Sequence, residues 1–349
     1  MTASVLSIVG ARPQFVKAGA VSRALGEAGI DEVLVHTGQH FDAAMSQVFF
    51  DDLGIPEPRY NLAIHSLGHG AMTGRMLEGL EEVMIAERPR MVLVYGDTNS
   101  TLAGALASAK LHIPVAHVEA GLRSFNRRMP EEINRVAADH VSEILFCPTR
   151  TAVANLANES VTRNVHMVGD VMYDATIYAL RRAEERSSII EQLGLGETPY
   201  GVATIHRAEN TDDPARFGRI VDWLVARSLE QPIVIPVHPR TKRLLEEKAV
   251  AGERLRLIEP LGYLDMARLL SRAKAVYTDS GGLQKEAYFH RVACVTLRDE
   301  TEWVETIEAG WNRLWTTEEY RARAEITDYG AGDAAQKIAN IVKGWLEAA

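Results

Sequence analysis

The chain has 349 residues, of which 46% are hydrophobic and 24% charged, and its formal net charge is −9. This length accommodates two domains with separate cores, and the acidic balance argues against a nucleic-acid binder or a polybasic membrane-surface protein. No apolar run reaches transmembrane length, and the sequence opens on a strand pattern without a signal sequence, so a cytoplasmic protein is expected. Cys147 and Cys294 lie in apolar runs, which predicts buried free thiols.

Apolar, β-rich runs alternate with helical patterns in the first half of the chain. Nearly continuous apolar strands separated by helices are typical of a parallel sheet that is covered on both faces. The predicted strands are 5–9, 33–36, 91–95, 115–118, 144–147 and 165–168, and the helices between them include 17–27, 70–87 and 102–110.

A second series of the same kind begins near residue 200. Its predicted strands are 202–205, 233–237, 255–258, 275–278 and 292–296. Residues 173–195 lie between the two series, and their charged helical pattern predicts one connecting helix. The fold class expected is therefore α/β, with two doubly wound Rossmann-like domains over residues 1–170 and 171–332. An amphipathic helix within 333–349 is expected to pack back on the first domain.

Polar and charged residues gather where the predicted strands end. Ligands bind beyond the carboxyl ends of the strands in open parallel sheets, and buried turns rarely hold many unpaired charges. These segments together predict a polar central cleft that the two domains face. They are 10–14, 36–40, 96–100, 117–123, 206–210, 238–240 and 279–282.

The sharpest signal is a strand at 273–277 followed by Ser280, Gly281, Gly282 and a helix. Glycines let the backbone approach a ligand closely, and the free N–H groups of a helix N-terminus attract an anion. Glu286 lies further along that helix, where a carboxylate suits the hydroxyl groups of a ribose. The segment predicts a nucleotide or nucleotide-sugar site. The alternative is a tight strand-to-helix turn that binds nothing.

Three acids are candidates for proton transfer. Asp97 and Glu119 follow strands that should be neighbours, and two carboxylates in one cleft raise each other's pKa and can act as acid and base. Asp97 has an alternative role as a helix N-cap before Thr98. Glu131 and Glu132 follow a proline at a predicted helix start, where either acid could do no more than favour the positive helix end.

Basic residues accompany these acids. Arg12 follows the first strand and Lys17 comes about one helical turn later, so together they could hold a diphosphate or a sugar, or else pair with an acid of the cleft. A group of four arginines suggests an anion nearby. These are Arg123, Arg127, Arg128 and Arg135.

His206 and Arg207 end a strand of the second series, where an imidazole can donate to a phosphate or a leaving group. A single histidine there would more often be structural, but Glu209 and Asn210 stand beside it, which favours function. No dinucleotide fingerprint, Walker motif or zinc-spaced cluster occurs, so neither a cofactor nor a metal is expected.

Six motifs in order and at similar spacing resemble the non-hydrolysing UDP-N-acetylglucosamine 2-epimerases from end to end. They are GARP (10–13), GDT (96–98), HVEAGLR (117–123), PEEINR (130–135), HRAEN (206–210) and TDSGG (278–282). The resemblance implies the glycosyltransferase-B architecture and a homodimer. It also implies reversible conversion of UDP-N-acetylglucosamine to UDP-N-acetylmannosamine for surface polysaccharide synthesis, with a UDP-sugar substrate and without a cofactor or metal.

The resemblance also implies roles for individual residues. The positions that match the family's catalytic residues are Asp97, Glu119, Glu131 and His206. The positions that match substrate-binding residues are Arg12, Lys17, Arg135, His238, Ser280, Gly281, Gly282 and Glu286. Gln39 and His40 align with a segment near a second, regulatory substrate site that some members have.

The first motif departs from the commonest family pattern, Gly-Thr-Arg-Pro-Glu, because Ala11 and Gln14 replace the threonine and the glutamate. This variant resembles a branch that includes epimerases of UDP-2,3-diacetamido-glucuronate, so both sugars stay open as substrates. Arg127 or Arg128 could meet the C6 carboxylate of that sugar, or the two could form a solvated basic pair. Rival functions are a UDP-sugar transferase of the same architecture, a hydrolysing epimerase and a non-catalytic UDP-sugar sensor.

Elementary chemistry limits the mechanism. The C2 hydrogen of the sugar has no adjacent carbonyl, so its direct removal as a stable carbanion is implausible. We therefore expect UDP to leave C1, a base to remove the C2 proton, and UDP to add back to the resulting 2-acetamidoglucal after a proton returns on the other face.

Overall fold

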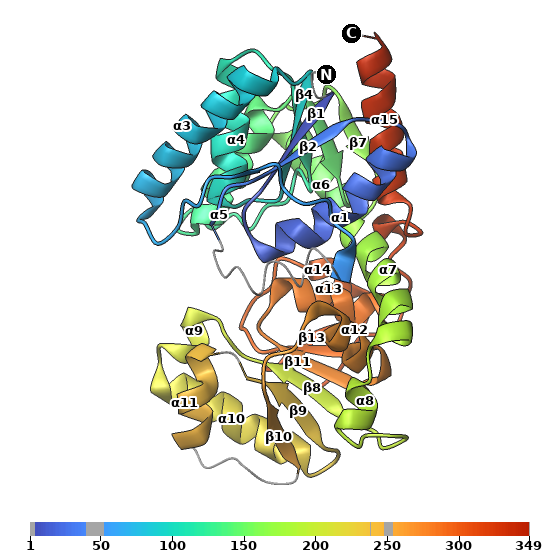
Figure 1. Cartoon of the computed structure of the whole chain (residues 1–349). Coiled ribbons are helices and arrows are strands. Elements are labelled where there is room, and N and C mark those ends of the chain that lie inside the picture. The colour runs from blue at the N-terminus through green and yellow to red at the C-terminus, as the bar shows by residue number, and fades with distance from the viewer. Residues whose placement is uncertain (1–3, 40–51, 238, 248–253, 349) are drawn as a thin grey trace. The chain divides into compact units, whose positions relative to one another are not determined.

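The computed structural model describes residues 4–39, 52–237, 239–247 and 254–348, which form two compact units (Figure 1). The first unit comprises Met1–Ile177 and Thr327–Ala349, and the second comprises Tyr178–Ile326. Each unit contains a parallel β-sheet with helices packed around it, and each is described by itself below.

In the described part of the first unit, the sheet has seven strands in the order β3-β2-β1-β4-β5-β6-β7. All neighbours pair in parallel. The strands are β1 (Val5–Val9), β2 (Glu32–His36), β3 (Tyr60–Asn61), β4 (Met91–Tyr95), β5 (Val115–Val118), β6 (Ile144–Cys147) and β7 (Val165–Met167). The chain builds outward from β1 through β2 to β3 and then returns to β4 on the other side of β1. This reversal is the switch point where doubly wound folds place ligands, beyond the carboxyl ends of β1 and β4.

Helices cover the first sheet, and small residues let them approach it closely. A Cβ atom on Gly104 of α4 would lie 2.6 Å from Cδ1 of Ile8 in β1, so a larger residue would require the Ile8 side chain to shift. The helices of this unit are α1 (Arg12–Glu27), α3 (His69–Glu87), α4 (Asn99–Lys110), α5 (Pro130–Val141), α6 (Arg150–Asn158) and α15 (Ala334–Ala348). Helix α7 (Val171–Arg186) begins in the first unit and continues past Ile177 into the second.

The C-terminal helix α15 belongs to the first unit, where it packs alongside α1 (Figure 1). Its first turn is held by Asp174 of α7, whose carboxylate accepts hydrogen bonds from the backbone N–H groups of Ala334 (3.3 Å) and Ala335 (2.9 Å). This contact satisfies donors that a helix N-terminus otherwise leaves unpaired.

In the described part of the second unit, six parallel strands have the order β10-β9-β8-β11-β12-β13. They are β8 (Gly201–Thr204), β9 (Ile233–Pro236), β10 (Leu255–Ile258), β11 (Ala275–Thr278), β12 (Ala293–Thr296) and β13 (Asn312–Leu314). The helices are α8 (Ile189–Gln192), α9 (Ala208–Thr211), α10 (Pro214–Ser228), α11 (Pro239–Glu247), α12 (Tyr263–Arg272), α13 (Gly281–Phe289) and α14 (Val304–Glu308). The switch point lies between β8 and β11, so the turns after these two strands share one edge of the sheet.

The predicted doubly wound α/β class is confirmed, and the eleven predicted strands all occur within one or two residues of their expected ends. The single connecting helix predicted at 173–195 is wrong, because α7 ends at Arg186 and α8 begins at Ile189. Two strands were not predicted, β3 and β13, since each has only two or three residues and includes polar side chains. No helix among the described residues is long and apolar enough to cross a membrane.

Candidate active site

Two turns at the switch point of the first sheet carry the predicted acids. Strands β4 and β5 pair in parallel, with Tyr95 opposite Val118 at their carboxyl ends. Gly96 and Asp97 follow one strand and Glu119 follows the other, so the two acids lie on adjacent turns as the sequence predicted. Gly96 and Glu119 both have positive φ angles, 61° and 72°. A non-glycine residue in this region is uncommon, and such strain tends to occur at functional sites.

Glu119 forms an ion pair with Lys17 of α1, and both side chains are largely buried. A Cβ atom on Gly96 would lie 3.2 Å from Nζ of Lys17 and 3.3 Å from Oε2 of Glu119, so the Gly96 backbone lies against the pair. Of the two roles expected for Lys17, the structure therefore shows the ion pair with a neighbouring acid. Arg12 is the first residue of α1 and is partly exposed.

Asp97 binds a different cation, Arg135 of α5. Its Oδ2 atom accepts from Nη2 at 2.5 Å and from Nε at 3.1 Å. Surrounding protein raises the pKa of Asp97 by desolvation, and the charges of Arg135 and Lys17 offset this only in part. The side chain still has 30% of its surface exposed, so it is accessible as well as crowded. The N-cap alternative for Asp97 is wrong, because Thr98 caps α4 with its own side chain.

The two consecutive glutamates of α5 lie in different surroundings. Glu132 is buried, and its carboxylate accepts from the backbone N–H groups of Ser124 and Phe125, each at 2.9 Å, and from Nη1 of Arg135 at 2.9 Å. Burial would raise the pKa of Glu132, but the hydrogen bonds from Ser124 and the charge of Arg135 outweigh it and lower the pKa. Glu132 therefore holds the preceding loop and Arg135, whereas Glu131 is exposed in the first helical turn.

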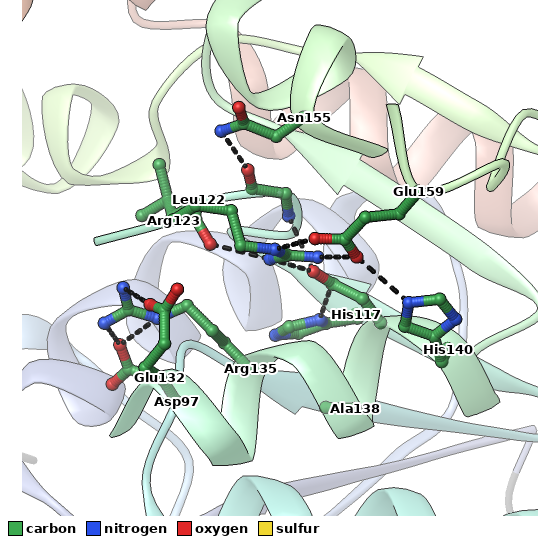
Figure 2. A network of polar contacts seen from close by, with 12 residues as sticks. Asp97, His117, Leu122, Arg123, Glu132, Arg135, Ala138, His140, Asn155 and Glu159 are labelled. Atoms are coloured by element: carbon green, nitrogen blue, oxygen red, sulfur yellow. Dashed lines mark hydrogen bonds and ion pairs between the residues drawn. The ribbon is translucent and has the colours of Figure 1, made fainter. Parts of the chain in front are cut away.

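A buried polar network lies behind the two turns (Figure 2). His117 of β5 is fully buried, with Nε2 at 2.7 Å from the carbonyl oxygen of Gly96 and Nδ1 at 2.7 Å from Oδ1 of Asp139. The other carboxylate oxygen of Asp139 accepts from the backbone N–H of Gly121 at 3.1 Å and from Nη1 of Arg123 at 2.7 Å. The network thus touches the backbone of both turns.

Arg123 continues the network outward. Its Nε and Nη2 atoms donate to the two carboxylate oxygens of Glu159 at 2.7 Å and 2.8 Å, and His140 contacts the same carboxylate at 2.9 Å (Figure 2). For two of the four arginines, the expected anions are carboxylates of the protein itself. Arg123 and Arg135 have carboxylate partners within the first unit.

In the second unit, Asp279 organises the turn that contains the predicted histidine. Its side chain is fully buried after β11, and its carboxylate accepts from the backbone N–H groups of His206 (3.0 Å) and Arg207 (2.9 Å) and from Nδ2 of Asn210 (3.0 Å). Nδ1 of His206 lies 3.2 Å from Oδ1 of Asp279. Burial would raise the pKa of Asp279, but its hydrogen bonds outweigh burial and lower the pKa. The largest of these contributions comes from the His206 side chain.

The predicted phosphate cradle has the expected local geometry. Ser280 is the N-cap of α13, and its side chain accepts a backbone hydrogen bond from the first turn of that helix. A Cβ atom on Gly281 would lie 2.5 Å from Oε1 of Glu302 and 3.2 Å from Nε1 of Trp303, so a larger residue would displace both side chains. Gly282 is exposed at the start of α13.

Glu286 lies in the middle of α13 and is buried. Desolvation raises its pKa to about 7, and the neighbouring charge of Lys285 opposes that shift. Nζ of Lys285 lies 4.0 Å from the ring centroid of Trp303, which is within cation–π range. Among the described residues, no group of three or more His, Cys, Asp or Glu side chains is arranged to hold a metal ion.

The remaining predicted positions divide into two sets. Gln39 follows β2, and its side-chain oxygen accepts from Oγ of Ser100 at 2.9 Å, which places it beside the first-unit switch point. His40 and His238 lie outside the described residues.

Gln14 has a structural role that the sequence analysis missed. Its side-chain oxygen accepts from the N–H groups of Gly10 (2.8 Å) and Ala11 (3.1 Å), and its amide donates to the carbonyl of Tyr95 (2.7 Å) and to the hydroxyl of Thr101 (3.0 Å). The amide thus ties the turn after β1 to the end of β4. A glutamate would have no N–H to donate, so this departure from the commonest motif suits the local structure.

The family model described as UDP-N-acetylglucosamine 2-epimerase matches residues 23–343. The chain belongs to this family. A UDP-2,3-diacetamido-2,3-dideoxy-D-glucuronate 2-epimerase from Pseudomonas aeruginosa is 54% identical over 315 residues, covering 89% of this chain and 87% of that protein. A UDP-N-acetylglucosamine 2-epimerase homolog from Methanococcus maripaludis is 48% identical over 356 residues, covering 97% of this chain and 99% of the relative.

The solved structures agree with this assignment to the epimerase family. The crystal structure of the UDP-N-acetylglucosamine 2-epimerase from Methanocaldococcus jannaschii, in complex with UDP-N-acetylglucosamine and UDP, is 39% identical in sequence. It superposes with a TM-score of 0.86 and covers 97% of this chain and 98% of its own. The predicted family resemblance and glycosyltransferase-B fold class are thereby confirmed.

Other residues of this epimerase-family site escaped the sequence analysis because their signal was ambiguous. Asp139 lies on α5 and Glu159 directly follows α6, each among other charged residues, and nothing in their spacing marks them as members of one network. His117 did leave a usable signal. It is a polar residue in the otherwise apolar β5 strand, at a position where the sheet is covered on both faces.

Proposed function

We propose that this protein catalyses reversible C2 epimerisation of a UDP-N-acetylhexosamine without net hydrolysis. The observation that carries the proposal is the pair of acids at the first-unit switch point, where Asp97 binds Arg135 and Glu119 binds Lys17 on adjacent turns. Membership of the epimerase family supports the same reaction. The proposal includes a homodimer and a role in making precursors of surface polysaccharides, as the resemblance implies.

The reaction proceeds by loss and return of UDP. The C1–O bond breaks with its electron pair going to the diphosphate, a base removes the C2 proton, and a C1–C2 double bond forms in the 2-acetamidoglucal. A proton then returns to the opposite face of C2, and a diphosphate oxygen bonds again to C1. Both fragments must stay bound between these steps, because escape of either one would end in net loss of the substrate.

The two acids differ in surroundings, as an acid–base pair should. Desolvation raises the pKa of Asp97, which favours its protonated form relative to an exposed aspartate, and its side chain is partly exposed. Glu119 is held by the buried Lys17 ammonium group. We assign these two residues, with Glu131 of α5, to proton transfer and to stabilisation of positive charge at C1, without dividing those roles.

The second unit is suited to the nucleotide. The N-terminus of α13 at Ser280 and Gly281 presents backbone donors to an anion, and His206 offers a further donor beside Asp279. These groups are proposed to stabilise the departing diphosphate. Glu286 is proposed to accept hydrogen bonds from the ribose hydroxyls, and it must be ionised to accept with both oxygens.

Two sugars are candidate substrates. UDP-N-acetylglucosamine is the substrate type that the family name indicates. The Pseudomonas aeruginosa relative, 54% identical, is named for UDP-2,3-diacetamido-2,3-dideoxy-D-glucuronate, which favours that uronate as the second candidate. Arg127 and Arg128 are exposed beside the loop that Glu132 holds, and either one suits the additional C6 carboxylate.

Proton NMR of the purified protein with each sugar nucleotide in D2O tests the proposal. The expected result is the manno epimer with deuterium at C2, and an Asp97→Asn variant is the matched control that should give none. An epimer that keeps its C2 proton would contradict proton exchange. Stoichiometric release of UDP with free sugar would instead identify a hydrolysing enzyme.

A further inference from the structure

The buried group His117–Asp139 contacts the backbone of both turns that carry the candidate acids. Nε2 of His117 faces the carbonyl of Gly96, which is the peptide group joined directly to Asp97. Through Asp139 the same pair also reaches the N–H of Gly121, two residues after Glu119. Figure 2 shows the His117 imidazole within this polar network, near Arg123.

Hydrogen-bond chemistry fixes the state of this pair. A carbonyl oxygen and a carboxylate oxygen are both acceptors, and each lies 2.7 Å from one ring nitrogen of His117. Both nitrogens can donate only when the imidazole carries two protons. The ring is therefore an imidazolium paired with the Asp139 carboxylate, and Arg123, a second cation on Asp139, is balanced by its own ion pair with Glu159.

Stability alone does not account for this arrangement. The side chains of His117 and Asp139 are fully buried, and that of Arg123 is 1% exposed. Buried ion pairs commonly contribute no more to stability than well-packed apolar residues of similar size, because taking charges out of water is costly. A geometric role is the better explanation, since such networks are rigid when every donor and acceptor is satisfied.

The turns themselves need external support. Glu119 has a φ of 72°, which is uncommon for a residue with a side chain, whereas the φ of 79° at Gly121 is one that glycine adopts readily. A Cβ atom on Gly121 would lie 2.4 Å from the carbonyl oxygen of Ala152, so the turn is pressed against α6. Asn155 of α6 holds the carbonyl of Gly121 at 3.0 Å while Asp139 holds its N–H. Strained backbone persists only when its surroundings fix it in this way.

We propose that His117 and Asp139 are positioning residues that keep the Gly96–Asp97 peptide and the Ala120–Gly121 peptide in fixed positions relative to each other, and with them the turns that carry Asp97 and Glu119. The catalytic importance of these positions rests on the proposed function, whereas the contacts themselves do not depend on it. His117 sets the Asp97 turn through the Gly96 carbonyl, and Asp139 sets the Glu119 turn through Gly121. Displacement of a reacting group by about 1 Å costs on the order of 100-fold in rate.

Two substitutions of one residue separate positioning from bulk stability. The amide nitrogen of a glutamine can occupy the place of Nε2, whereas that of an asparagine can occupy the place of Nδ1. His117→Gln therefore keeps a donor for Gly96 and gives up the bond to Asp139, and His117→Asn does the reverse. Both remove the ring and its charge. His140→Gln is the control, because His140 contacts Glu159 at the exposed end of the network.

The expected result is a kcat lowered about 100-fold in His117→Asn and about 10-fold or less in His117→Gln, with KM and UDP affinity within a few-fold of wild type. His140→Gln should keep wild-type kcat. Equal losses in the two His117 variants, or losses that follow their melting temperatures, would overturn the proposal.

A second pair of variants covers the case in which His117 variants do not fold. In Asp139→Asn, the amide can donate to Nδ1 of a neutral His117, whose Nε2–H still reaches Gly96, while the amide oxygen serves Gly121. Asp139→Ala removes both supports. Asp139→Asn should keep at least tenfold more kcat than Asp139→Ala, and equal activity of the two would contradict the assignment.

Amide hydrogen exchange provides a readout that needs no turnover. Exchange in peptides covering residues 95–98 should be faster in His117→Asn than in His117→Gln, and in peptides covering 119–122 it should be faster in Asp139→Ala than in Asp139→Asn. Unchanged exchange would overturn the inference. A wild-type protein that converts neither UDP-sugar would refute the proposed function, and the exchange data would still decide the positioning role.

Discussion

The switch points of the two sheets are built from different kinds of contact. In the first unit, the carboxylates of Asp97 and Glu119 pair with the side chains of Arg135 and Lys17. In the second unit, the buried carboxylate of Asp279 accepts hydrogen bonds from the backbone of the neighbouring turn. Side-chain pairs set protonation states, whereas backbone donors and helix ends bind anions. This difference is the reason why we propose proton transfer at the first switch point and diphosphate binding at the second.

The largest effect should come from Asp97→Asn. An amide of the same size cannot take or give the proton, so kcat should fall about 100-fold to 10,000-fold, the usual range for a general acid or base. UDP affinity measured by calorimetry should stay within about threefold, since the proposed nucleotide groups belong to the second unit. Full activity would remove Asp97 from the mechanism. A parallel loss of UDP binding would contradict the proposal that the first unit supplies the acids and the second unit binds the nucleotide.

Lys17→Met should have the next largest effect, on stability. It removes the cation that pairs with the largely buried Glu119, and loss of one partner of a buried pair costs about 3–5 kcal/mol of the free energy of unfolding. The measurement is urea unfolding, with Lys17→Arg as the matched control because it keeps the charge. Equal stability of the methionine variant and the wild type would show that Lys17 and Glu119 do not form a buried ion pair in solution.

The pH dependence of stability should reveal Glu286. Its pKa is raised from 4.5 to about 7 in the folded protein, so the folded state holds a proton that the unfolded state releases between these values. The stabilisation is full below about pH 4.5 and is lost as the pH rises through about 7, with a total of roughly 3 kcal/mol. Thermal unfolding from pH 5 to 8 should therefore show a steeper decline in the wild type than in Glu286→Gln. Parallel curves would contradict the raised pKa.

Ser280→Ala should have the smallest effect of the four. Loss of an N-cap costs about 1 kcal/mol of stability, and UDP affinity should fall by up to about tenfold as the α13 terminus loosens. Epimerisation at saturating substrate should change little, because the acids of the first unit are untouched. Ser280→Asp is no suitable control, since its charge repels a diphosphate, so Ser280→Thr serves instead. A large fall in kcat with unchanged UDP affinity would place Ser280 in the chemistry.

The sequence predicted the strands because buried parallel strands are apolar on both faces, and it placed the acids because ligands meet the carboxyl ends of such strands. Asp97 and Glu119 were assigned to neighbouring turns on that rule, and the pairing of β4 with β5 confirms the placement. Short strands could not be predicted from the same pattern of apolar residues. β3 has two residues and β13 three, too few for any period to show.

The ion-pair partner of each charged site residue could not be predicted, because it depends on which side chains of distant elements come into contact. Lys17 could equally have faced a diphosphate, and only the packing of α1 against the sheet brings it to Glu119. The two glutamates of α5 look alike in sequence, yet a rotation of about 100° per residue buries Glu132 and exposes Glu131. The role of Glu131 stays a prediction.

Positional isotope exchange tests the central claim most directly. A UDP-sugar is prepared with ¹⁸O in the oxygen that bridges C1 and the diphosphate, and the protein is incubated with it until epimerisation reaches equilibrium. If UDP leaves C1 and returns, the terminal phosphate rotates in the site and ³¹P NMR detects ¹⁸O in non-bridging positions of recovered substrate. Epimer formation with all of the label still in the bridge would show that no UDP free to rotate forms in the site, and it would contradict the account.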